Sequence, residues 1–158
     1  MGTGIEELGI DSYIKEQFEI PSVDIRTYSP LTLAYIGDGV FDLVIRSIIV
    51  GRGNTKASQL HHHTSHIVKA HTQAVIIELL LPFLTEEEED VYRRGRNAKT
   101  PTMAKNATMQ DYRKATGFEA LLGYLYLTDD FKRVVELTRK GLELLNEKEP
   151  LWDTKKAK

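Results

Sequence analysis

The chain has 158 residues, of which 41% are apolar and 28% charged, a size and balance typical of a single globular domain. It contains no cysteine, which excludes disulfides, zinc ribbons, iron–sulfur clusters and a cysteine nucleophile and favours a cytoplasmic location. The net charge of −2 argues against a uniformly basic nucleic-acid-binding domain. No apolar run is long enough to cross a membrane, and the first ten residues lack the pattern of a secretion signal.

Apolar residues recur with helical spacing along the chain and no convincing strand pattern appears, so we expect an all-α fold. Ser29 and Pro30 predict the start of a helix that runs to about Val50 and stops at the glycines that follow. A second helical region is expected from a cap at residue 54 or 55 as far as Leu81, where Pro82 ends it.

Capping patterns mark two of the later helices. Thr85 followed by Glu88 is a capping box, which predicts a helix to about residue 94 that ends at Gly95. Residues 95–107 are rich in Gly, Asn, Thr and Lys and predict a long basic loop. Thr108 then opens a helix to residue 127, and the acids at 129 and 130 suit the start of a last helix. That last helix carries an apolar face made of Phe131, Val134, Val135, Thr138, Leu142 and Leu145.

Two carboxylates lie among residues typical of a buried core. Asp38 stands between Gly37 and Gly39 in an otherwise apolar helix, and Glu119 stands one turn before Gly123 in another. Glycine in a helix interior costs about 1 kcal/mol relative to alanine, a cost that is understandable where two backbones approach closely. If the helices cross at these glycines, the carboxylates face each other and need a shared cation, for which Mg²⁺ is the natural candidate. The alternative is that Asp38 pairs locally and Glu119 reaches solvent.

These two segments resemble the signatures of the ribonuclease III endonuclease family. Residues 31–40 (LTLAYIGDGV) keep the Gly-Asp-x-Val end of the first signature, and residues 116–127 (TGFEALLGYLYL) match the second closely. The resemblance implies the all-α ribonuclease III catalytic-domain fold. It also implies that Asp38 and Glu119 are the catalytic carboxylates and that they bind Mg²⁺, for which Mn²⁺ can substitute.

The chain departs from the family pattern at three acidic positions, which are Leu31, Ala34 and Thr116 here. Fewer acids leave the number of bound ions open. Thr116 precedes Glu119 by one helical turn, so we expect its hydroxyl to orient that carboxylate or a water on the metal.

Within the family, residues 35–38, 94–99 and 116–121 resemble Mini-ribonuclease III, whose chain is a catalytic domain alone. This resemblance implies a homodimer that cuts double-stranded RNA, leaves 5′-phosphate and 3′-hydroxyl ends, and matures the 23S ribosomal RNA precursor. Tyr35 and Phe41, on the helix of the first signature, are candidates for part of the dimer contact.

The resemblance also suggests a division of the chain. We expect an N-terminal helical extension over residues 1–24 and a ribonuclease III-like catalytic domain over residues 25–147. Residues 148–158 are expected to form a disordered tail, and no double-stranded-RNA-binding domain is expected.

The charge is distributed unevenly. Residues 86–90 are five consecutive acids, whereas residues 91–114 hold seven basic residues and one acid, a net +6. A basic stretch in an acidic chain suggests a face for a polyanion, although solvated helix faces and a solvated loop give the same pattern. On the first interpretation, the stretch binds duplex phosphates and 2′-hydroxyls through Arg94, Arg96, Asn97, Lys99 and Lys105.

All five histidines fall between positions 61 and 71, and His62 and His66 have the spacing of a helical metal pair. Three consecutive histidines cannot share one helix face, so we expect a solvated face rather than a zinc site. Two rival functions stay open. One is a non-catalytic double-stranded-RNA-binding protein on the same fold. The other is an all-α metal-dependent nucleotide pyrophosphohydrolase, for which residues 86–89 offer a Glu-x-x-Glu spacing.

Overall fold

The computed structural model describes residues 9–99 and 108–148, and within these ranges the chain forms helices and no strand. The predicted all-α fold is therefore confirmed. Lys105, the first eight residues of the predicted extension and all but the first residue of the predicted tail lie outside the described residues. The elements in chain order are α2 (Ile10–Gln17), η1 (Ile25–Thr27), α3 (Pro30–Gly51), α4 (Ala57–Val68), α5 (Ala70–Leu80), η2 (Leu81–Phe83), α6 (Glu86–Arg96), α7 (Met109–Leu127) and α8 (Phe131–Lys148).

Three helices begin at the predicted caps. The Ser29 hydroxyl accepts a backbone N–H from the first turn of α3 at 3.2 Å. Thr85 and Glu88 form the predicted capping box at the start of α6, with hydrogen bonds of 3.1 and 2.9 Å. The Thr108 hydroxyl accepts a backbone N–H from the first turn of α7 at 3.0 Å. Each cap satisfies an N–H group that the helix itself leaves without a partner.

The second predicted helical region is wrong in two respects. Its first helix begins at Ala57 rather than beside residue 54 or 55, and the region is broken at Lys69, where the backbone is extended (φ −69°, ψ 157°). The break separates α4 from α5. A side chain from the first turn of α5 bridges this break. The Thr72 hydroxyl donates to the carbonyl of His66, in the last turn of α4, at 2.8 Å. A local periodicity does not reveal such a break, since both halves keep apolar residues at helical spacing.

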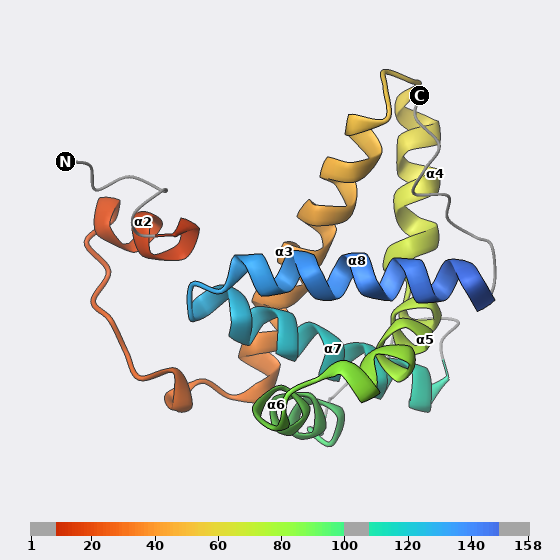
Figure 1. Cartoon of the computed structure of the whole chain (residues 1–158). Helices are drawn as coiled ribbons and strands as arrows, with labels where there is room; N and C mark the ends of the chain where they lie inside the picture. Colours follow the sequence, from red (N-terminus) through yellow and green to blue (C-terminus); the bar gives the residue numbers. More distant parts are fainter. Residues whose placement is uncertain (1–8, 100–107, 149–158) are drawn as a thin grey trace.

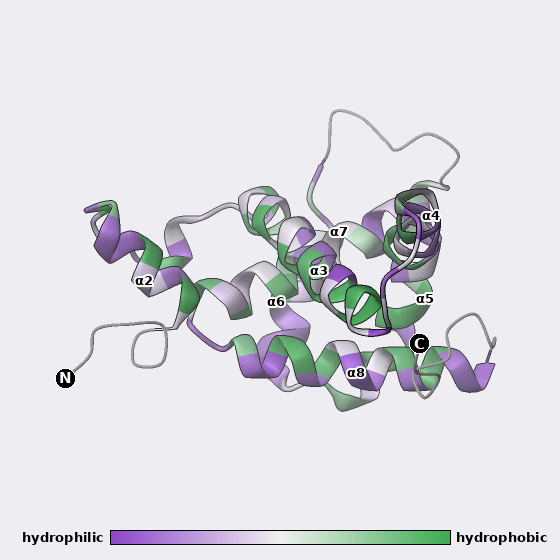
Figure 2. Cartoon of the chain, turned by 90° about the horizontal axis from the view of Figure 1, so that it is seen from above, coloured by the Kyte–Doolittle hydropathy of each residue, from purple (hydrophilic) through white to green (hydrophobic). Residues whose placement is uncertain are grey.

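Helix α7 lies at the centre of the molecule and packs against α3, α5, α6 and α8 (Figure 1). The core between these helices contains the edge-to-face pair of Phe41 and Phe118, whose ring centroids are 5.3 Å apart. Phe41 is only 1% exposed, so it belongs to the core and is not available for a dimer contact, whereas Tyr35 is 83% exposed. Green and purple residues alternate along α8 in Figure 2, as expected for a helix that buries one face.

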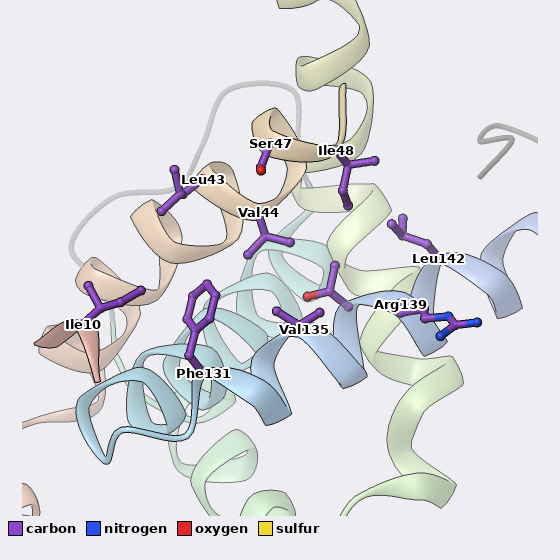
Figure 3. Close-up of a pocket in the computed structure, with 10 residues that line it drawn as sticks. Ile10, Leu43, Val44, Ser47, Ile48, Phe131, Val135, Arg139 and Leu142 are labelled. Atoms are coloured by element: carbon purple, nitrogen blue, oxygen red, sulfur yellow. The ribbon is translucent and has the colours of Figure 1, made fainter. Parts of the chain in front are cut away.

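An apolar groove lies between α2, α3 and α8, and it contains neither of the two predicted catalytic carboxylates (Figure 3). Ile10, Leu43 and Phe131 line it, together with Val135. Val135 was expected on the buried face of the last helix, but it is 43% exposed at this groove. No helix among the described residues combines the length and apolar character needed to span a bilayer.

Candidate active site

Helices α3 and α7 cross at two glycines, as predicted. A Cβ atom on Gly37 would stand 1.7 Å from the carbonyl oxygen of Glu119, and one on Gly123 would stand 1.9 Å from the carbonyl oxygen of Leu33. Side chains cannot occupy such spaces, so only glycine lets these two backbones touch. Gly39 differs, because nothing lies within 4 Å of the position its Cβ would take. The close approach explains Gly37 but not Gly39.

The crossing brings Asp38 and Glu119 together. Asp38 follows Gly37 and is exposed, whereas Glu119, on the contact side of α7, is partly buried. The pKa of Glu119 is raised to about 8, first by burial and then by the negative charge of Asp38 and a hydrogen bond with it. Asp38 has no basic partner among the described residues, whereas Asp42 pairs with Arg46 at 2.6 Å. The local ion pair of Asp38 that the alternative requires is thus not seen among the described residues.

A glutamine that the sequence analysis did not single out completes this arrangement. Gln73, in the first turn of α5, is 1% exposed and donates from Nε2 to Glu119 Oε2 at 3.3 Å. This hydrogen bond lowers the pKa of Glu119 and so opposes the effect of burial. The sequence offers one sign of this role, because Gln73 is an amide on the buried face of a helix whose other buried residues are mostly apolar.

The donor set suits a hard divalent cation. It consists of two carboxylates, whose oxygens are hard ligands, beside the neutral amide of Gln73, which donates to Glu119. The described residues contain no cluster of three or more His, Cys, Asp or Glu side chains placed to hold a metal. Mg²⁺ requires no such cluster, because it is commonly held through one or two carboxylates and keeps several of its waters. After burial, the negative charge of Asp38 is the next cause that raises the pKa of Glu119, and a cation bound between the two carboxylates would offset it. The residues present therefore fit Mg²⁺.

The Thr116 side chain is buried on α7, and its hydroxyl donates to the carbonyl of Tyr112 at 2.9 Å. This bond lies within its own helix. No described contact joins Thr116 to Asp38 or Glu119. Its predicted role in orienting Glu119 stays a prediction.

Arg96 lies with Arg94 in the last turn of α6 rather than in the predicted loop, because the helix continues past Gly95. Gly95 packs on α7, where its Cβ would stand 2.9 Å from the Gly117 Cα. The basic end of α6 thus rests beside the turn of α7 that carries Glu119.

The basic side chains differ in their partners. Arg94 Nε pairs with Asp90 at 3.2 Å, and the Arg96 guanidinium stands 5.6 Å from the centre of the Tyr92 ring. Asn97 and Lys99, which follow α6, are exposed. These exposed and half-exposed groups are accessible to a polyanion, and their predicted RNA contacts stay predictions.

The histidines and the acidic run have other partners or face solvent. Four of the five histidines are exposed on α4, and His71 on α5 pairs with Asp111 at 2.9 Å. In the acidic run, Glu88 is buried and accepts hydrogen bonds from Arg133 at 2.8 and 2.9 Å. Glu87 accepts a hydrogen bond from the Tyr124 hydroxyl at 2.6 Å. The run therefore stabilises α6, and nothing in its geometry favours the pyrophosphohydrolase alternative.

The model of the ribonuclease III domain family matches residues 31–130, a span that holds both carboxylates and the helix crossing between them. The all-α fold and this match together define the class of protein, a ribonuclease III domain.

Named relatives identify the branch of this class. A Mini-ribonuclease 3 from Clostridium tetani is 43% identical over 130 residues, which cover 82% of this chain and 86% of that protein. A Mini-ribonuclease 3 from Enterococcus faecalis is 47% identical over 116 residues, covering 72% of this chain and 88% of that protein. A crystal structure of a protein from Fusobacterium nucleatum has a TM-score of 0.71 at 29% identity and covers 77% of this chain and 99% of that one. The chain belongs to the ribonuclease III family and, within it, to the Mini-ribonuclease 3 proteins. The predicted family and the predicted enzyme class, an endoribonuclease, are confirmed.

Proposed function

We propose that this endoribonuclease hydrolyses double-stranded RNA in a Mg²⁺-dependent reaction that leaves 5′-phosphate and 3′-hydroxyl ends. The observation that carries the proposal is the pairing of Asp38 with Glu119 across the glycine crossing of α3 and α7. A chain that needed only to bind RNA would have no reason to hold two carboxylates together in a partly buried site, because each repels the other and the phosphate.

The chemistry assigns a task to each group. Hydrolysis of a phosphodiester needs an attacking water in line with the departing 3′ oxygen and a positive charge on the phosphate, and Mg²⁺ supplies that charge and activates water. Asp38 and Glu119 would hold the ion through their carboxylate oxygens. Because Asp38 is exposed and Glu119 is partly buried, Asp38 is the carboxylate proposed to lie nearer the substrate.

The basic end of α6 is the proposed RNA-binding surface. Arg94, Arg96 and Lys99 neutralise phosphates, and Asn97 binds a 2′-hydroxyl, in the manner by which A-form duplexes are recognised. Lys105 is proposed to extend this surface. The position of Gly95 against α7 supports the proposal, since it keeps these residues near the turn that carries Glu119.

The proposed active form is a homodimer, because two antiparallel strands present two scissile phosphates and one domain holds one carboxylate pair. Tyr35, 83% exposed one turn before Asp38, is the proposed centre of the dimer contact. The 23S ribosomal RNA precursor is the proposed substrate in the cytoplasm.

The test compares a long double-stranded RNA with a single-stranded RNA, each with Mg²⁺ and with EDTA. Wild-type protein is expected to cut only the duplex and only with Mg²⁺. Asp38→Asn and Glu119→Gln are expected to lose at least about 100-fold in cleavage rate, the scale for removing a group that stabilises transition-state charge. Asp42→Asn is the matched control, because it removes a carboxylate from the same helix that pairs with Arg46. Duplex binding without cleavage under any divalent ion would favour the non-catalytic alternative.

A further inference from the structure

Gln73 makes two hydrogen bonds from one nitrogen. Its Nε2 donates to the carbonyl of Val68 at 2.6 Å and to Glu119 Oε2 at 3.3 Å. A backbone carbonyl can only accept, so the short contact to Val68 fixes which end of the amide is the nitrogen. Val68 is the last residue of α4, where carbonyl groups lie beyond the hydrogen bonds of the helix. Gln73 therefore links the C-terminal end of α4 to the Glu119 carboxylate.

The other end of the amide has no protein partner among the described residues. Gln73 Oε1 is buried and accepts no hydrogen bond there. A buried acceptor without a donor destabilises the folded protein, and an apolar side chain of the same size avoids that cost. An amide at this position is understandable if it serves the carboxylate pair next to it.

We propose that Gln73 is a positioning residue that holds the Glu119 carboxylate in the orientation needed to bind a divalent cation with Asp38. This inference rests on the proposed function of the carboxylate pair and adds a third residue to it. The neutral amide donates to Glu119 without adding charge, and its second hydrogen bond to the Val68 carbonyl fixes its own position.

Thr72 provides a matched control for this role. It precedes Gln73, is 2% exposed, and also bridges the break by donating to the His66 carbonyl at 2.8 Å. It makes no hydrogen bond to Glu119. Thr72→Val therefore removes a bridge of the same kind and leaves the carboxylate contact in place.

The experiment measures Mn²⁺ binding to the full chain without RNA, from the electron paramagnetic resonance signal of free Mn²⁺. Gln73→Met and Gln73→Leu both remove the amide but have different shapes, so a change shared by both reports the lost hydrogen bonds. Each is expected to weaken Mn²⁺ binding about 10-fold or more, the usual effect of losing a group that orients a metal ligand. Thr72→Val is expected to bind Mn²⁺ within about twofold of wild type.

A second readout separates positioning from folding. With saturating duplex RNA, cleavage by the Gln73 variants is expected to recover at high Mg²⁺, with RNA affinity unchanged and with thermal midpoints close to that of Thr72→Val. Wild-type Mn²⁺ affinity in either folded Gln73 variant, or an equal loss in Thr72→Val, overturns the inference. If Asp38→Asn and Glu119→Gln also bind Mn²⁺ like wild type, the carboxylate site itself is refuted, which is a separate failure.

Discussion

Alanine at Gly37 tests whether the backbone contact between α3 and α7 organises the site. The added Cβ would stand 1.7 Å from the Glu119 carbonyl oxygen, and contacts under 3.0 Å essentially do not occur. The two helices must therefore separate by at least 1.3 Å, the difference between those distances. The obstacle is backbone and cannot rotate away, so the cost lies at the upper end of the overpacking range, about 3 kcal/mol. The higher helix propensity of alanine stabilises α3 by about 1 kcal/mol, so the free energy of unfolding is expected to fall by about 2 kcal/mol in total.

Gly39→Ala is the control, two residues away on the same helix. Its Cβ would meet nothing within 4 Å, so only the propensity gain applies and the variant is expected to be about 1 kcal/mol more stable than wild type. Urea unfolding followed by circular dichroism measures both variants. With a slope of about 1–3 kcal/mol per M urea, a difference of about 3 kcal/mol separates their midpoints by roughly 1–3 M. Cleavage is expected to fall in Gly37→Ala alone, because the carboxylates move apart with the helices. Coincident midpoints would refute the reasoning.

Two further predictions concern titration and a buried ion pair. The pKa of Glu119 near 8 exceeds its usual value of 4.5, so without divalent ions the folded protein holds a proton that the unfolded chain has released. The free energy of unfolding is then expected to fall as pH rises from about 4.5 to about 8, by up to about 5 kcal/mol, and Glu119→Gln is expected to lack this fall. Urea titrations of both proteins across this interval measure it, and parallel pH profiles would contradict the assignment. Arg133→Met leaves the Glu88 carboxylate buried without its partner and is expected to cost about 3 kcal/mol. Arg139→Met, which breaks an exposed pair on the same helix, is expected to cost less than about 1 kcal/mol. Equal thermal midpoints for the two arginine variants would show that burial does not matter.

The helix starts and the candidate carboxylate pair are both predictable from sequence, for different reasons. A cap such as Ser29 or Thr108 binds an N–H group only a few residues away, so its whole geometry is contained in a short segment. Asp38 and Glu119 were recognisable because a carboxylate beside a helical glycine contradicts its apolar surroundings. Their family signatures then supplied the chemistry.

The errors share a physical origin in contacts between distant segments. Phe41 was predicted to contribute to a dimer contact, but it is buried because Phe118, from a distant helix, packs against it. The helix through Arg96 continues past Gly95, because that glycine is a packing contact with α7 and not a stop. The contact of Gln73 is likewise beyond local sequence, because its partner Glu119 lies 46 positions further along the chain.

Residue type and short spacing are enough to predict the all-α class, the caps of α3, α6 and α7, and the two candidate carboxylates. The packing of the helices is needed to tell which glycine is a backbone contact, how deeply each carboxylate is buried and which side chain donates to Glu119. Those properties arise where α3, α5 and α7 meet, and burial and charge proximity there have no counterpart in any single helix.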